Sequence, residues 1–119
     1  MNAPTLLDWT EGTDGITYQQ CGHCTHVWYF RREFCPSCGK ASPPRQQSTG
    51  TGVLHALTRV FRAPSEALRV HAPYSIGLVD LDEGVRVMAH VRDDARIGDR
   101  VRAEFVTFGD RRIPSFCKE

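Results

Sequence analysis

Long hydrophobic runs are missing from the sequence: the longest uninterrupted apolar stretch among its 119 residues spans only positions 27–30. A membrane span needs about 20 apolar residues, and residues 1–12 lack the Lys or Arg that opens a secretory signal, so we expect a cytoplasmic protein. An excess of charge is missing too, because 15 Lys and Arg stand against 14 Asp and Glu. Proteins that grip a nucleic-acid backbone usually carry a basic excess, which places nucleic acid low among the expected partners.

Catalytic motifs are also absent. The sequence shows no glycine-rich phosphate loop, no Ser-His-Asp arrangement and no paired carboxylates, and no His-x-Glu motif accompanies its cysteines. With 40% apolar and 24% charged residues, the composition is that of an ordinary globular protein with room for one modest domain, or for a metal-held module beside a small core domain. We therefore expect no catalysis by this chain alone.

Cysteine, in contrast, is abundant. Two Cys-x-x-Cys pairs, Cys21/Cys24 and Cys35/Cys38, are separated by ten residues. Two residues between thiolates let a tight turn aim both sulfurs at one ion, and two such turns face to face form the closed tetrahedral shell that zinc prefers. The spacing predicts a structural zinc site, and we expect residues 25–34 between the pairs to form a hairpin.

Three other uses of the same cysteines compete with a structural zinc site. A pair of disulfides needs an oxidising compartment, for which the sequence carries no targeting signal, and a catalytic zinc needs an open coordination position that four thiolates do not leave. An iron centre of the rubredoxin type would use the same ligands, and the sequence does not separate it from zinc. We expect His23 and His26 to lie near solvent, and the fifth cysteine, Cys117, to be a small packed residue.

Changes in amino-acid composition along the chain predict three parts. Residues 1–20 form an N-terminal arm with a short helix and a brief strand at 16–20, residues 21–45 form the zinc ribbon, and residues 46–119 form the main domain. Prolines and glycines among polar residues favour a linker at 42–52. Alternating or β-branched runs predict five strands, at 53–62, 74–81, 85–92, 100–108 and 112–117. The fold class is thus mainly β, a rubredoxin-like ribbon followed by a five-stranded antiparallel barrel of the OB type.

Basic residues on the predicted strands are candidates for ligand binding. Arg59, Arg62, Arg86 and His90 occupy polar positions where strands of such a barrel commonly meet ligands, and arginine pairs well with phosphate. The competing interpretation is a solvated outer face, in which each arginine pairs with a neighbouring carboxylate.

The sequence resembles a family of zinc-ribbon plus OB-fold proteins, long catalogued as a domain of unknown function and associated with acyl-CoA enzymes. The resemblance covers nearly the whole chain and rests on the four cysteines, the linker and the segments 50–54 (GTGVL), 72–74 (APY), 78–84 (LVDLDEG) and 97–101 (IGDRV). It implies a barrel that lacks the usual helix between its third and fourth strands, for which residues 93–98 are indeed too few.

Members of this family act as non-catalytic subunits of thiolase, acyltransferase or steroid side-chain aldolase complexes. The resemblance therefore implies a thiolase-fold partner and a coenzyme A thioester as ligand, with the zinc role on the four cysteines and the coenzyme A role on the basic barrel residues. The leading hypothesis is an accessory subunit that binds a thiolase-fold protein and helps bind or channel an acyl-CoA. The alternative is a separate module for single-stranded nucleic acid, which barrels of this type also bind.

Overall fold

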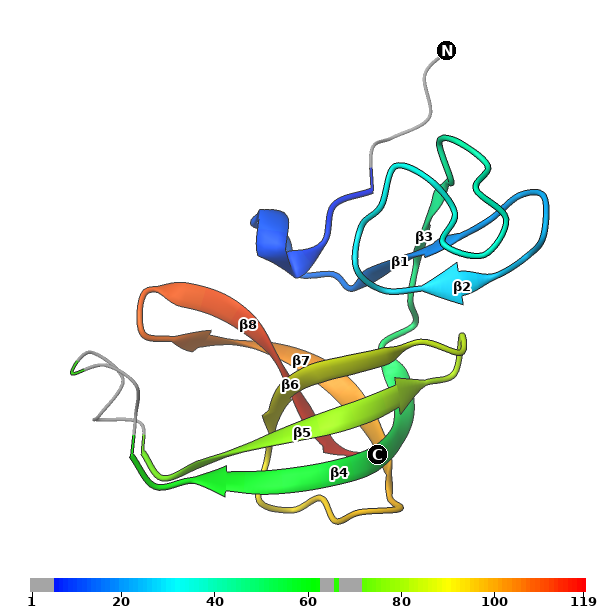
Figure 1. Ribbon diagram of the computed structural model, residues 1–119. Helices are drawn as coiled ribbons and strands as arrows, with labels where there is room; N and C mark the ends of the chain where they lie inside the picture. The colour runs from blue at the N-terminus through cyan, green and yellow to red at the C-terminus, as the bar shows by residue number, and fades with distance from the viewer. Residues whose placement is uncertain (1–5, 63–65, 67–71) are drawn as a thin grey trace.

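A computed structural model describes residues 6–62, 66 and 72–119. It contains two β units, a small three-stranded sheet and a closed barrel, joined by the segment that leads from β3 to β4 (Figure 1). Residues 1–5 of the expected arm, and residues 63–65 and 67–71 of the expected main domain, lie outside the described residues. No helix in the described part of the chain is long and apolar enough to cross a membrane.

The small sheet has the order β2-β1-β3, with β1 (Thr17–Gln20) pairing antiparallel to β2 (Val27–Trp28) and to β3 (Arg45–Gln47). The strand β3 lies inside the stretch predicted as a linker, which is therefore wrong for residues 45–47. Its polar side chains gave no strand signal, because the strand is formed by backbone pairing with β1 rather than by burial of an apolar face.

The expected hairpin over residues 25–34 is wrong as well. Each cysteine pair is instead spanned by its own hairpin, closed by Gln20 opposite Val27 for the first pair and by a bridge between Phe34 and Ala41 for the second.

The predicted N-terminal helix is a single 3-10 turn, η1 (Trp9–Glu11). Asp8 caps it with a side chain that accepts from the backbone N–H of Thr10, and Glu11 returns the contact by accepting from the backbone N–H of Asp8. Gly12 ends the turn at a φ of 94°, a left-handed conformation that glycine adopts without strain. The short element nevertheless fixes Asp8 and Trp9 against the ribbon.

The barrel is built from five strands whose bounds match the predicted ones within two residues: β4 (Thr51–Val60), β5 (Tyr74–Leu81), β6 (Arg86–Val91), β7 (Arg100–Phe108) and β8 (Arg111–Lys118). Their order around the barrel is β4-β5-β6-β8-β7, and pairing of β4 with β7 closes it. The strand between β6 and β7, β8, runs parallel to β6, so the barrel is not purely antiparallel as expected. A closed ring with an odd number of strands cannot alternate direction at every pair. The connection from β6 to β7 contains turns and no helix, as the resemblance implied.

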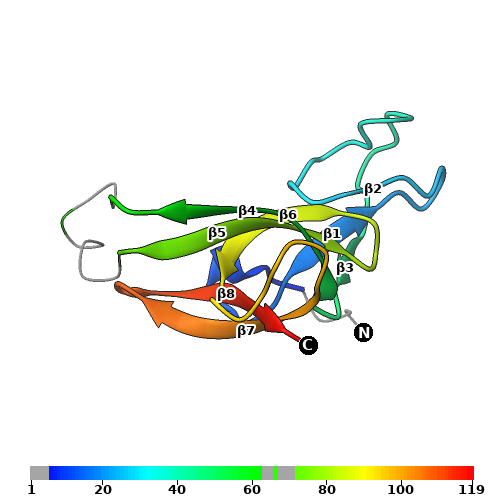
Figure 2. The ribbon, with the colours of Figure 1, turned by 90° about the horizontal axis from the view of Figure 1, so that it is seen from below.

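The core of the barrel is made by inward residues of the alternating strands. Leu54, Val79, Val101 and Phe116 are its largest fully buried members. The ribbon lies beside the barrel near the turn between β5 and β6 (Figure 2). Tyr18, Val27 and Tyr29 of the small unit pack against the barrel core. The two units are also tied by an ion pair between Arg112 and Asp14, at 2.7 Å. The ribbon is thus held against the barrel rather than attached only by a linker.

Candidate metal centre

The side chains of Cys21, Cys24, Cys35 and Cys38 converge between the two hairpins. All four Sγ atoms lie within 4.8 Å of one another, and Sγ to Sγ distances of 3.6 Å join Cys21 to Cys38 and Cys24 to Cys35. A tetrahedral ion with bonds of about 2.3 Å to sulfur separates its ligands by roughly 3.8 Å. The donor set and its spacing therefore fit a metal ion bound by four thiolates.

The two cysteine turns repeat the same backbone pattern. The N–H of Cys21 donates to the carbonyl of His26 at 2.9 Å, and the N–H of Cys35 donates to the carbonyl of Lys40 at 2.9 Å. The residue that follows the first turn is Thr25 with a φ of 67°, whereas Gly39 holds the matching place in the second turn with a φ of 80°. The left-handed conformation costs a threonine more than a glycine, so the first turn is the more strained of the two.

Backbone amides stabilise negative charge on the inner sulfur of each turn. The N–H groups of Cys24 and His23 donate to the Sγ of Cys21, both at 3.4 Å, and lower the pKa of Cys21 to about 6. Burial opposes ionisation of Cys35, but the N–H groups of Cys38 and Ser37 outweigh it and hold the pKa of Cys35 below its ordinary value. Both sulfurs are prepared to bind a cation as thiolates.

The last ligand behaves differently. The N–H of Lys40 favours the thiolate of Cys38, but burial and the neighbouring cysteines outweigh it and raise the pKa of Cys38 to about 12. Thiolates this close repel one another, so all four ionise together only when a cation balances them. The cluster can hold a metal ion in a closed shell, and such a shell offers no open position for a substrate.

A single glutamine holds the ribbon together around this centre. Gln19 is 5% exposed, and its side-chain amide donates to the carbonyls of Arg32 and Pro43. Its side-chain oxygen accepts from the backbone N–H of Arg32 and from the indole N–H of Trp28, and both of these accepted bonds measure 2.7 Å. It therefore fixes both the loop between the cysteine pairs and the segment before β3. Sequence patterns do not predict this role, because a glutamine on a short strand looks like a surface residue.

The structure does not bring the four candidate ligand-binding residues into one site. Arg59 pairs with Asp93 at 3.1 Å, whereas Arg86 forms a two-pronged contact with Asp80 farther along the barrel, at 2.6 and 3.2 Å. Arg62 is exposed just beyond the end of β4.

His90 lies instead in a cluster of rings. Its ring stacks on Tyr74 with centroids 4.9 Å apart, and it also contacts the ring of Phe108, with centroids 4.4 Å apart. This cluster borders a cavity of about 550 Å³ at the mouth of the barrel. A ligand role for these residues stays a prediction.

The two histidines near the first cysteine pair and the fifth cysteine are placed as expected. His23 and His26 are exposed. Cys117 is 5% exposed on β8, its thiol lies 3.7 Å from the carbonyl oxygen of Arg102, and burial raises its pKa. A buried neutral thiol is a packing residue rather than a nucleophile.

Known proteins share both the sequence and the architecture of this chain. A family model described as the C-terminal OB-fold domain of ChsH2 matches residues 45–106. A DUF35 domain-containing scaffold protein from Methanothermobacter thermautotrophicus is 30% identical over 95 residues, which cover 76% of this chain and 71% of that protein. A protein of the same description from Methanocaldococcus jannaschii is 31% identical over 91 residues, covering 72% of this chain and 64% of that one.

Two solved structures have the same fold. A chain of an Ltp2-ChsH2(DUF35) aldolase matches with a TM-score of 0.74 at 24% identity, over 87% of this chain and 84% of that chain. A DUF35 protein of unknown function from Sulfolobus solfataricus matches with a TM-score of 0.58 at 13% identity, over 89% and 77% of the two chains. Together with the OB-fold barrel and the four-cysteine ribbon, the sequence matches show that this chain belongs to the DUF35 family.

Proposed function

We propose that this chain is a cytoplasmic, non-catalytic accessory subunit that holds a structural zinc ion, binds a thiolase-fold protein and helps that partner bind or channel an acyl-CoA thioester. The observation that carries the proposal is the closed four-cysteine ribbon packed on an OB-fold barrel without a catalytic constellation among the described residues. Relatives described as scaffold proteins, and the fold shared with a chain of an aldolase, support an accessory role.

Zinc is the metal that we propose for this donor set. Four thiolates in a tetrahedral arrangement suit zinc or iron, and the N–H groups that point at Cys21 and Cys35 stabilise the charge of either complex. Cys21, Cys24, Cys35 and Cys38 would hold the ion, which supplies folding energy to the ribbon and no chemistry to a substrate. In this proposal the nucleophile and the base of the reaction belong to the partner.

Native co-purification tests the partner. The untagged protein is isolated from its own cells by conventional chromatography, and every protein that elutes with it in constant ratio is identified by mass spectrometry. We expect a stoichiometric thiolase-fold subunit, and a higher affinity of the complex than of either separate subunit for an acyl-CoA.

The alternative function gives a different result in the same preparation. A monomer that binds single-stranded oligonucleotide, with an affinity that falls steeply as salt rises, would replace the proposal with the nucleic-acid module.

A further inference from the structure

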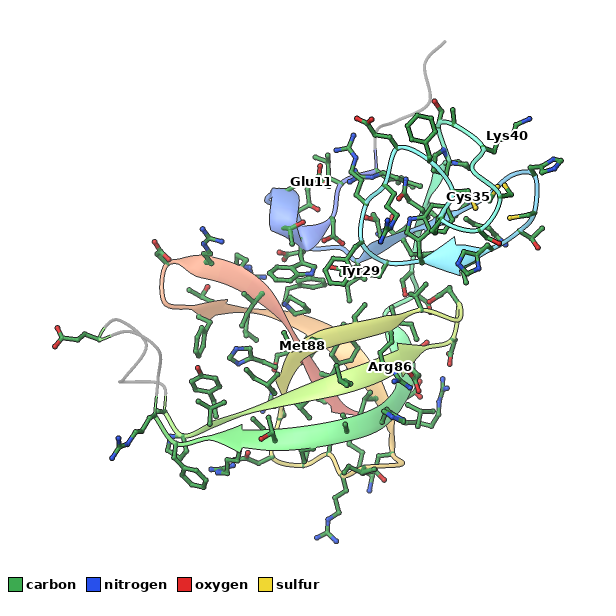
Figure 3. All side chains as sticks on the ribbon, viewed as in Figure 1. Glu11, Tyr29, Cys35, Lys40, Arg86 and Met88 are labelled. Carbon is green, nitrogen blue, oxygen red and sulfur yellow. The ribbon has the colours of Figure 1, made fainter. Side chains whose placement is uncertain are left out.

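A cavity of about 280 Å³ lies at the junction of the ribbon and the barrel. Its aromatic wall comes from Trp9 of η1 and from Tyr18 and Tyr29 of the ribbon, and Met88 of β6 contributes from the barrel. Figure 3 shows Tyr29 in the space between the two units, with Met88 on the barrel strand that faces it. Segments far apart in the sequence therefore build one apolar hollow.

The wall of this cavity is fixed by hydrogen bonds that satisfy its polar atoms. The indole N–H of Trp9 donates to the hydroxyl of Tyr29 at 3.0 Å, and that hydroxyl donates to the carboxylate of Asp8 at 3.0 Å. Asp8 is 6% exposed and also accepts from the backbone N–H of Thr17 at 2.9 Å. Because these groups bind one another, the aromatic wall offers mainly apolar surface, and it is already ordered before any ligand arrives.

The rim of the cavity carries large apolar side chains that nothing in the described chain covers. Phe30 is 78% exposed and Met88 is 67% exposed. The loop that carries Phe30 is ordered. Gln19 binds both the backbone N–H and the carbonyl of Arg32, and the ring of Phe30 lies edge-on to that of Tyr29, with centroids 5.3 Å apart. A small molecule inside 280 Å³ would leave these two side chains in water, whereas a protein surface would cover them.

The charge at the rim is mainly positive, although Asp8 also lines the cavity and Arg31 is close enough to Glu11 to help lower the pKa of that carboxyl. Arg31 lines the cavity and Arg32 follows it, and neither forms an ion pair with another described residue. Arg45, also at the cavity, is already engaged by Glu11 at 2.7 Å. A partner surface that approaches this rim gains most if it brings carboxylates.

We propose that this junction surface, defined as Trp9, Tyr29, Phe30, Arg31 and Met88, docks the partner subunit. One apolar side chain of the partner enters the cavity, and acidic side chains beside it pair with Arg31 and Arg32. The inference rests on the proposed function for the existence of a partner, and it adds where the partner binds and by what chemistry. The cavity has the size of an anchor site for one large side chain, the feature around which binding energy concentrates in protein interfaces.

The experiment uses the full-length chain and the partner subunit recovered by native co-purification. The two are separated and their affinity is measured by isothermal titration calorimetry for Met88→Glu and Arg31→Glu. The control variants are Ile97→Glu, at an equally exposed apolar position on the β6–β7 turn (63% exposed), and Arg96→Glu beside it. Circular dichroism verifies that each variant is folded. We expect Met88→Glu to weaken binding about 30-fold and Arg31→Glu about 10-fold, with the controls within about threefold of the unmodified chain.

The possible results separate a failure of the docking surface from a failure of the accessory function. Unchanged affinity of Met88→Glu and Arg31→Glu would overturn the junction surface as the docking site while leaving the accessory function intact. A native preparation without any partner subunit would overturn both. Saturable binding of octanoate to the isolated chain, lost in Met88→Glu, would assign the cavity to a small apolar acid and overturn the docking of a protein.

Discussion

Removal of the metal should unfold the ribbon and leave the barrel intact. Within residues 17–47, all of which are described, the only buried apolar side chains are Cys21 and Cys35, which are 2% and 3% exposed. The ribbon therefore has almost no core beyond its ligands, and its strands are two to four residues long. Zinc binding supplies an apparent 10–16 kcal/mol, roughly, in peptides of this kind, which is as large as the whole stability of a small domain. Without the metal the ribbon has nothing of similar size to replace it.

Heteronuclear NMR of the chelator-treated protein and of Cys35→Ser measures this effect. We expect the metal content to fall from about one ion per chain to none, and the amide signals of residues 21–44 to collapse toward random-coil positions. Signals of the barrel core, such as Leu54 and Val79, should keep their dispersion. Cys117→Ser is the matched control, since it alters a buried cysteine outside the cluster and should retain the metal. A metal-free protein whose ribbon amides stay dispersed would refute the reasoning.

Three further changes test other parts of the structure. Tyr29→Phe removes the donor to the buried carboxylate of Asp8 and should lower the free energy of unfolding by about 1–3 kcal/mol in urea titrations; a change below about 0.3 kcal/mol would contradict the role of that hydrogen bond. Gly77→Ala places a Cβ 2.7 Å from a methyl carbon of the core and should cost about 1–3 kcal/mol by the same measurement, with an unaltered midpoint counting against such close packing. Hydrogen bonds from Arg100 lower the pKa of Asp82 from 3.8 to about 2, so this ion pair stabilises the fold above pH 4 and is lost as the pH falls toward 2. Carbon-13 NMR should follow that carboxyl to a midpoint near 2, and in Arg100→Gln the midpoint should move up toward 3.8; the same midpoint in both proteins would refute the assignment.

Much of the candidate metal site could be predicted because its geometry is local. A Cys-x-x-Cys segment contains both ligands and the amides that stabilise them, so the turn around Cys21 and Cys24 follows from neighbouring residues alone. The barrel strands are predictable for a similar reason, since alternation such as Val87, Ala89 and Val91 against Arg86 reports which face is buried. The hairpin boundaries were not predictable, because they depend on pairings between separate segments such as Phe34 with Ala41.

The sequence by itself determined that four cysteines form a cluster able to hold a metal ion, that five strands follow it and that no catalytic motif accompanies them. Only the tertiary structure decided that β8 runs parallel to β6 and that the polar strand β3 completes the ribbon. It also decided that Arg86 pairs with Asp80 and does not share a site with Arg59. Only the tertiary structure, too, placed Trp9 and Met88 around one cavity. These features depend on contacts between residues distant along the chain, and such contacts follow from how the barrel closes and where the ribbon packs, which local spacing and periodicity do not encode.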